Sequence, residues 1–214
     1  MNLQHTNLRN QMMLRSFILT VSLLALNLGF ISSKTAQAQY RDCGLIRRTN
    51  EPPSSSLRTI RLEQFGIQVS IPENFRTILR QNNTVEIVHP DDFAMIECVA
   101  QGGRGGHGYY SEMIRLVSQD PSLSLREQAI WSVGYGYDIN QNKIPIATQV
   151  IEYNQLPLSG YIVTSRTGSS VNFVGNVTGR TEILYIDASC DCLVEVKNLT
   201  TLLSRIQPLN WRSP

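Results

Sequence analysis

"ATQVIEYNQLPLSGYIVTSRTGSSVNFVGNVTGRTEILYID" (residues 147–187) is the stretch of sequence that decides the fold. It contains four segments in which apolar and polar residues alternate, as they do in strands with one buried face. Short segments rich in Gly, Asn, Pro and Thr separate them, and "TGSS" (residues 167–170) is typical of a hairpin turn. Strands joined by such short connections pair antiparallel. We therefore expect an antiparallel meander here.

More strand patterns precede this stretch. "TIRLEQF" and "GIQVSIP" alternate in the same way, and "RTILRQ" and "TVEIVH" flank an "NN" turn that is typical of a hairpin. "AMIECVAQ" (residues 94–101) predicts another strand, with Glu97 facing water and Cys98 facing inward. After the meander, "CLVEV" (residues 192–196) predicts a last strand, again with its cysteine facing inward.

Helical patterns interrupt and follow the strands. "YYSEMIRLV" (residues 109–117) has apolar residues at helical spacing. "SLREQAIWSV" opens with Ser124 and has Glu127 three residues later, which predicts a capping box, and "NLTTLLSRI" predicts a closing helix capped by Asn198. Strands on both sides of a helical block predict an α+β fold. We expect an antiparallel sheet with helices packed on it, a single-domain sandwich over residues 59–214.

The N-terminus has the features of an export signal. Arg9 and Arg15 precede a short apolar run, "FILTVSLLALNLGF", and Ala36 and Ala38 form a small-residue cleavage site. This order is typical of a secretory signal peptide, here residues 1–38. The run is shorter than the 18 to 20 residues, roughly, that span a bilayer comfortably. We expect no stable membrane anchor after cleavage.

Residues 39–58 are polar, contain "NEPPSSS", and predict an extended leader. Loss of the signal peptide also removes three basic residues, so 16 basic side chains remain against 17 acidic ones. The mature chain is nearly neutral, which leaves no electrostatic argument for binding nucleic acid. We expect the protein to be exported, in the periplasm or outside the cell.

All four cysteines, Cys43, Cys98, Cys190 and Cys192, lie beyond the signal peptide. An even number in an oxidising compartment predicts two disulfides. A bond between Cys190 and Cys192 would close a very short ring, and Cys98 and Cys192 both face inward on expected strands. We therefore expect Cys98–Cys192 and Cys43–Cys190. The alternative interpretation of "CDC" is a metal or redox pair, although such pairs usually have two intervening residues.

The order of these elements, opened by "FGIQVSIPENF", resembles the PsbP/Mog/DcrB-like α/β/α sandwich superfamily. The resemblance covers residues 62–209 and includes an apolar strand followed by P-x-x-F, in which Phe75 stands where many members have Trp. Members include the extrinsic PsbP protein of photosystem II and small exported bacterial proteins. The superfamily has no shared catalytic site, so the resemblance implies a binding or assembly role.

The glycine-rich segment Gly102–Gly108, "GGRGGHG", is the first candidate ligand site. It lacks the Lys and Ser/Thr of a phosphate-binding loop, and it fits the dinucleotide pattern in glycines alone. We interpret it mainly as a loop or hinge. The alternative is a contact with an anion or partner through Arg104, His107 and Tyr109, at the start of the expected helix.

The segment "HPDD" is the second candidate, because His89, Asp91 and Asp92 have side chains that bind divalent ions. If His107 folded over them, a metal-dependent or hydrolytic site would form. An ordinary turn around Pro90 is the other interpretation. No G-x-S-x-G nucleophile motif occurs, and we expect no cofactor.

Aromatic residues form the third candidate. Trp131 is followed by "GYGYD", and two more tyrosines stand at the end of the glycine-rich segment. These aromatic residues either cover the rim of the sheet or form an exposed patch for a ligand or partner.

We expect a small exported non-enzymatic domain that binds another protein of the cell envelope or assists an assembly. The alternative hypothesis is an exported enzyme that uses His89, Asp91, Asp92 and His107.

Overall fold

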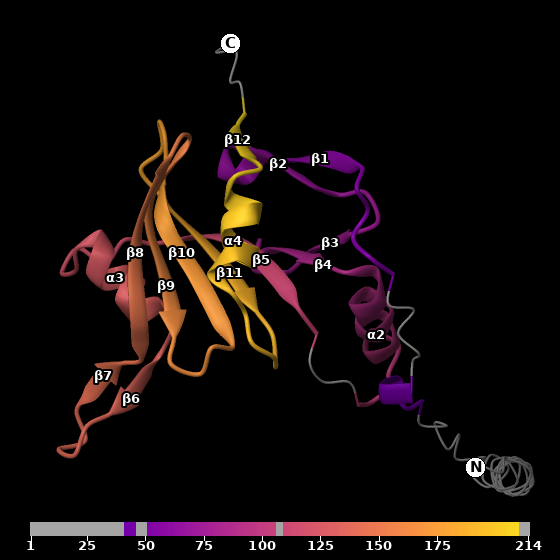
Figure 1. Ribbon diagram of the computed structural model, residues 1–214, viewed down its shortest axis with the longest axis horizontal. Coiled ribbons are helices and arrows are strands. Elements are labelled where there is room, and N and C mark those ends of the chain that lie inside the picture. The colour runs from indigo at the N-terminus through magenta and orange to yellow at the C-terminus, as the bar shows by residue number, and fades with distance from the viewer. Residues whose placement is uncertain (1–40, 46–50, 106–108, 210–214) are drawn as a thin grey trace, which may run out of the picture. The chain divides into compact units, whose positions relative to one another are not determined.

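The computed structural model describes residues 41–45, 51–105 and 109–209 (Figure 1). The expected signal peptide and His107 lie outside these residues. The described residues form three α-helices, twelve strands and two short 3-10 turns. In chain order these are η1 (Cys43–Leu45), β1 (Leu57–Leu62), η2 (Glu63–Phe65), β2 (Ile67–Pro72), β3 (Arg76–Leu79), β4 (Val85–Val88), α2 (Pro90–Ala100), β5 (Ser111–Val117), α3 (Leu125–Ser132), β6 (Tyr135–Tyr137), β7 (Lys143–Pro145), β8 (Ala147–Gln155), β9 (Leu158–Ser165), β10 (Ser170–Val177), β11 (Ile183–Ser189), α4 (Val196–Leu203) and β12 (Ile206–Pro208).

The largest sheet has seven strands in the order β3-β4-β5-β11-β10-β9-β8, and every neighbouring pair is antiparallel. The expected meander is confirmed as β8 to β11, which pair in sequence order. A close approach of two glycines keeps the middle of the meander tight, since Gly160 lies opposite Gly175 and a Cβ on either would press into the neighbouring strand. β1, β2 and β12 form a second antiparallel sheet, and β6 and β7 form a hairpin.

One face of the seven-stranded sheet lies in the main hydrophobic core. Ile114, Phe173 and Ile186 point from the sheet into this core, and Leu199 and Leu202 reach it from α4. These leucines lie on one side of the helix because they are three residues apart. Buried residues of β1, η2 and β2 complete the core: Leu62, Phe65, Ile67, Val69 and Ile71.

The opposite face packs on α3. Val163, Val174 and Tyr185 directly follow or precede residues of the main core along their strands, so their side chains point the other way. They form a separate cluster with Ala129 and Val133 of the α3 segment. Antiparallel sheets with helices packed on them confirm the α+β class, and α3 and α4 lie over opposite faces (Figure 1).

The strand expected over residues 94–101 is wrong, because this segment belongs to helix α2. Pro90 occupies the first helical turn, where its missing N–H costs no hydrogen bond, and the His89 side chain accepts a hydrogen bond from the Asp91 N–H. Asp91 and Asp92 lie at the positive end of the helix dipole. These start signals determine the helix more strongly than the alternation that follows them.

The helix expected over residues 109–117 is also wrong, because Ser111–Val117 is strand β5. It pairs with β4 on one side and β11 on the other, which is the tertiary contact that overrides a helical spacing of apolar residues. Ile114 is fully buried, whereas the next residue, Arg115, is exposed, as strand alternation requires. Residues 192–196 do not form the last strand either; they lead into α4, which begins one residue after Glu195.

Two expected helices are present. α3 begins with the predicted capping box: Ser124 Oγ accepts from the Glu127 N–H, and the Glu127 carboxylate accepts from the Ser124 N–H at 2.8 Å. α4 begins three residues earlier than predicted, with Glu195 and not Asn198 at its N-cap. The sequence analysis did not identify the β6–β7 hairpin or β12.

Candidate functional site

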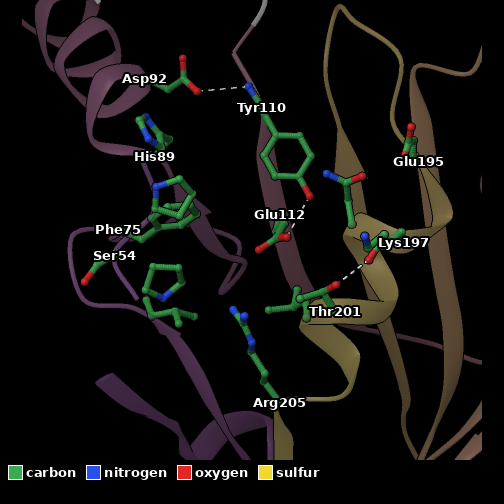
Figure 2. A pocket seen from close by; sticks show the side chains of 15 residues that line it. Ser54, Phe75, His89, Asp92, Tyr110, Glu112, Glu195, Lys197, Thr201 and Arg205 are labelled. Atoms are coloured by element: carbon green, nitrogen blue, oxygen red, sulfur yellow. Dashed lines mark hydrogen bonds between the residues drawn. The ribbon is translucent and has the colours of Figure 1, made fainter. Parts of the chain in front are cut away.

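A cleft of about 590 Å³ opens between β2, β5, the start of α2 and the segment from Glu195 to Arg205 (Figure 2). We call it the Glu112 cleft. Its volume lies in the range typical of small-molecule sites. Ile71, Phe75 and Leu202 give it apolar walls, and Phe75 contacts the His89 ring edge-on with ring centroids 5.5 Å apart.

Glu112 is one of two buried carboxylic acids that line the cleft, the other being Asp92. Glu112 follows Ser111 in β5 and lies on the same face as Ile114, so strand alternation turns it inward, and it is only 9% exposed. The Tyr110 hydroxyl donates a hydrogen bond to Glu112 Oε1 at 2.8 Å. Burial raises the pKa of the Glu112 carboxyl to about 7, although the Tyr110 hydrogen bond and the charge of Arg205 oppose this.

Tyr110 is held in place by two hydrogen bonds. Its backbone N–H donates to Asp92 Oδ2 at 3.3 Å, which ties β5 to the first turn of α2. Burial, reinforced by the neighbouring Glu112, raises the pKa of the Tyr110 hydroxyl well above its usual range. The hydroxyl therefore stays protonated at neutral pH and acts as a donor to Glu112.

Two cations lie across the cleft from Glu112 (Figure 2). Lys197 is exposed in the first turn of α4, and Arg205, which is half-buried, follows the end of that helix. The Arg205 backbone N–H donates to Leu202 O at 2.9 Å, and its carbonyl accepts from Ser70, so its main chain is fixed. The cleft therefore combines apolar walls with the buried acid Glu112 and the guanidinium of Arg205, whose main chain is fixed, which is a geometry for recognition.

The buried Glu112 makes stability depend on pH. Its pKa is about 7 in the fold against an ordinary value of 4.5, so the unfolded chain loses this proton first as the pH rises. The free energy of unfolding therefore falls between pH 4.5 and pH 7, by about 3 kcal/mol from this group, and levels off above it. Glu112→Gln removes this fall, and denaturant unfolding at pH 5 and pH 8 measures it.

The matched control is Glu152→Gln, which alters an exposed carboxylate on β8. We expect this control to follow the wild-type pH dependence. Were Glu112→Gln to differ from the wild type by the same free energy at pH 5 and pH 8, Glu112 would not carry the dependence.

His89, Asp91 and Asp92 lie at the start of α2. His89 Nδ1 accepts from the Asp91 N–H at 3.3 Å, and its Nε2 lies 2.6 Å from the carbonyl oxygen of Glu51, to which it must donate. Both ring nitrogens are thus engaged, and a metal would have to displace one of these bonds. Within residues 41–45, 51–105 and 109–209, no group of three or more His, Cys, Asp or Glu side chains is placed to hold a metal ion.

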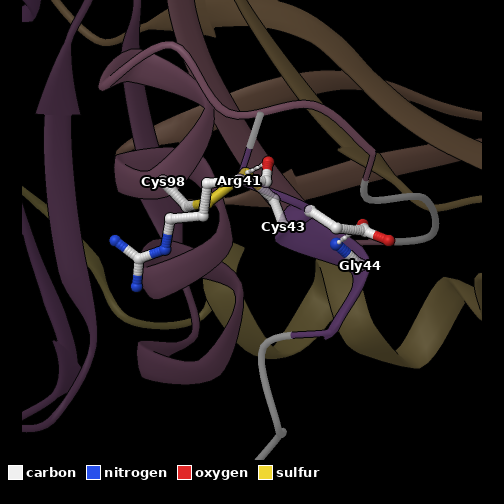
Figure 3. Close-up of a disulfide and its surroundings, with 5 residues drawn as sticks. Arg41, Cys43, Gly44 and Cys98 are labelled. Carbon is white, nitrogen blue, oxygen red and sulfur yellow. Dashed lines mark hydrogen bonds between the residues drawn. A yellow bond between two sulfur atoms is a disulfide. The ribbon is translucent and has the colours of Figure 1, made fainter. Parts of the chain in front are cut away.

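Both disulfides form, but both expected pairings are wrong. Cys43 bonds Cys98 with Cα atoms 5.8 Å apart (Figure 3). Cys190 bonds Cys192 with Cα atoms 4.9 Å apart. Cys98 lies on helix α2, whose inner side faces η1, and not on a strand beside Cys192. The chain bends directly after β11, which brings Cys190 and Cys192 within the usual disulfide range.

The described part of the glycine-rich segment packs against this first disulfide. The Arg104 N–H donates to Arg41 O at 2.9 Å, and Arg104 O accepts from the Cys43 N–H at 2.7 Å. Gly103 lies so close that a Cβ there would meet Cys98 Sγ at 2.8 Å and the sulfur of Cys43 as well. Because Gly103 has no side chain, η1 and its disulfide can pack directly against the backbone at this position.

The four residues expected to contact a ligand or partner are not gathered in one place. Arg104 and Tyr109 lie beside the Cys43–Cys98 bond, where Tyr109 packs on its cluster, whereas Trp131 lies on α3. α3 contacts β8, β9 and β10, at the far side of the sheet from α2 (Figure 1). His107 lies outside the described residues.

Apolar side chains gather instead on the β6–β7 hairpin, which follows Trp131 of α3 in the chain. Tyr135 and Tyr137 are exposed and meet edge-on with ring centroids 5.7 Å apart, and Lys143 Nζ lies 4.3 Å from the Tyr135 ring centroid. Ile139 at the hairpin tip is 95% exposed. We call these residues, with Trp131, the aromatic hairpin.

The tip of the aromatic hairpin is ordered by its own side chains. Asp138 Oδ1 accepts from the N–H groups of Asn140 and Asn142, each at 2.8 Å, and the Asn142 amide donates to Asp138 Oδ2. These bonds close the turn around Ile139. The isoleucine is therefore presented to solvent by a defined loop.

The sequence analysis missed Glu112, Arg205 and Ile139. The signal for Glu112 was present, since "SEMIRLV" read as a strand places Glu112 on the same face as Ile114 and Leu116. Arg205 and Ile139 carry no local signal, because only the tertiary fold sets what each faces.

No protein-family model and no curated protein matches the sequence. The part of the chain that the structure describes contains no helix long and apolar enough to cross a membrane.

Proposed function

We propose that this protein is an exported, non-enzymatic domain that binds another protein of the cell envelope, or assists an assembly there, through its aromatic hairpin. Two disulfides in the described chain are compatible with an oxidising compartment, and the expected signal peptide supports the periplasm or the cell exterior. A single-domain sandwich related to the PsbP/Mog/DcrB-like superfamily remains our proposal for the fold family and agrees with a binding role.

The observation that carries the proposal is the exposure of Ile139 on an ordered turn at the tip of the hairpin that also carries the exposed Tyr135 and Tyr137. Aromatic residues are enriched at the energetic centres of protein interfaces, where they bury large area at low entropic cost. Lys143 places its ammonium over the Tyr135 ring, a cation–π contact that favours this orientation of the ring. The partner we propose has an apolar pocket that receives the hairpin tip.

The test removes the apolar surface and keeps the turn. Tyr135→Ser/Tyr137→Ser/Ile139→Ser leaves Asp138 and its backbone hydrogen bonds in place. We expect the wild-type protein to retain an envelope protein from an extract of the producing cells, and the triple variant to bind that purified partner more than tenfold more weakly, as loss of central interface aromatics usually does.

The matched control is Leu79→Ser, which removes an apolar side chain that is 67% exposed at the other end of the sheet. We expect it to bind like the wild type. Equal affinity of the triple variant and the wild type would overturn the role of the hairpin, and a wild type that retains no more envelope protein than an unrelated bait would overturn the proposed function.

A further inference from the structure

Glu112 and Arg205 face the same space in the cleft without meeting. Both side chains line the Glu112 cleft, and the charge of Arg205 acts to lower the pKa of the Glu112 carboxyl. Both residues belong to the described chain, and no ion pair joins them there. Tyr110 donates to Oε1 of Glu112, and Oε2 receives no protein hydrogen bond among the described residues. Figure 2 shows the guanidinium and the carboxyl on two sides of one gap.

A side chain that is nine-tenths buried and turned toward an open cleft is costly unless something compensates it. An ion pair with Arg205 would be the ordinary compensation, and the fold keeps the two groups apart. A ligand that presents a positive group to Glu112 and a negative group to Arg205 would satisfy both at once. Such a bridge uses two charge-assisted hydrogen-bonding sites of opposite sign.

The remaining walls define the rest of that ligand. Ile71, Pro72, Phe75 and Leu202 line the same cleft and present hydrocarbon. Apolar contact of this kind stabilises a bound aliphatic or aromatic side chain in proportion to the area removed from water. The volume of about 590 Å³ leaves room for more than one such side chain.

We propose that the Glu112 cleft binds a small apolar zwitterion, an α-amino acid or a short peptide with apolar side chains. Its ammonium group lies against Glu112, its carboxylate against Arg205, and its side chains against Ile71, Phe75 and Leu202. This site goes beyond the proposed function, because it lies on different elements from the aromatic hairpin.

The other ionisable groups that face the cleft do not change this choice. Tyr110 stays protonated, and Lys197 and Glu195 are exposed on or next to α4 and oppose each other in charge. Asp92 and His89 lie at the start of α2 with the hydrogen bonds described above. A simple carboxylic acid would be repelled by the negative charge of Glu112, and a simple amine would be repelled by the positive charge of Arg205.

Calorimetric titration of the disulfide-bonded protein at pH 8 tests the ligand class. The probes are L-leucine and L-leucyl-L-leucine, and the blocked controls are N-acetyl-L-leucine and L-leucinamide. We expect at least one zwitterion to bind. Each blocked compound should bind at least about tenfold more weakly, and a tenfold loss corresponds to about 1.4 kcal/mol. The two zwitterions distinguish a free amino acid from a peptide.

Two variants test the contacts. Glu112→Gln keeps the size of the side chain and an acceptor for Tyr110 but removes the charge, and Arg205→Gln removes the guanidinium. Each variant should lower the affinity for the zwitterion about tenfold or more. Near-ultraviolet circular dichroism checks that each variant is folded. Glu152→Gln on β8 should bind like the wild type. Wild-type affinity should fall as the pH is lowered from 8 to 5.5, because Glu112 then becomes neutral.

The outcomes separate this site from the hairpin. The triple hairpin variant should bind the zwitterion like the wild type even where it has lost its protein partner. No heat from either zwitterion at millimolar concentrations, equal binding of the blocked compounds, or unchanged binding by Glu112→Gln would each overturn the proposal, and none of these would bear on the aromatic hairpin.

Discussion

Cys43→Ser/Cys98→Ser is expected to lower the free energy of unfolding by about 4 kcal/mol. The bond joins residues 55 positions apart, and in the chain-entropy model a cross-link of this length removes roughly that much freedom from the unfolded chain. The bond also fixes η1 against α2, where Cys43 is almost fully buried with Met95. Denaturant unfolding of the oxidised wild type and the variant, with both proteins monitored by fluorescence, measures the difference.

The second disulfide supplies the control for this prediction. Cys190 and Cys192 are two positions apart, so the same model gives their bond only about 1.5 kcal/mol. Cys190→Ser/Cys192→Ser is therefore expected to be the milder of the two double variants. A larger loss from this pair, or non-reduced peptide maps that join Cys98 to Cys192, would contradict the connectivity described here.

The wrong pairings had two physical origins. The segment around Cys98 was taken for a strand, and the bond between Cys190 and Cys192 was excluded as too short a ring, although the bend after β11 brings their Cα atoms within 4.9 Å. "AMIECVAQ" alternates well enough for a strand, and short apolar runs do not distinguish a strand from a buried helix. The helix start signals at His89 and Pro90 precede the alternating part, so they were read as a turn. Once Cys98 is on a helix, its inward side faces η1, and Cys43 becomes the near cysteine.

The strands were predictable where local signals and tertiary pairing agree. In β8 to β11, alternation, turn residues and strand order all favour the same meander, and the structure has it. In β5 they disagree. The apolar residues of "SEMIRLV" fit a helix in isolation, and only pairing with β4 and β11 makes the segment a strand.

The candidate sites follow the same logic. Trp131, Tyr135 and Tyr137 were noted from the sequence as either the covered rim of the sheet or an exposed patch, and only the structure shows that Tyr135 and Tyr137 are exposed. The Glu112 cleft was not identified from the sequence, since it needs β5 as a strand and Arg205 brought back from the end of α4. Residues more than ninety positions apart along the chain form that cleft, and no spacing rule relates them.

The second large effect concerns a buried carboxylate on β4. Glu86 points to the face of the sheet opposite the main core, its side chain is 2% exposed, and it forms an ion pair with Arg80, whose side chain is 41% exposed. Arg80 Nε donates to Glu86 Oε2 at 2.7 Å, and Nη2 donates to the same oxygen. Since water reaches only the arginine, the carboxylate depends on this one partner far more than the arginine does.

We therefore expect Arg80→Met to lower the free energy of unfolding by about 3 kcal/mol, because it leaves a charge buried without its partner while keeping most of the aliphatic stem. Glu86→Met should cost much less, since water solvates Arg80, and Arg80→Met/Glu86→Met should recover most of the loss in a double-mutant cycle. Arg61→Met, which breaks an ion pair with exposed Glu63, should change little. A double variant as unstable as Arg80→Met alone would instead assign the loss to packing of the arginine stem, and the buried charge would then not be what holds β4 and the end of β3 together.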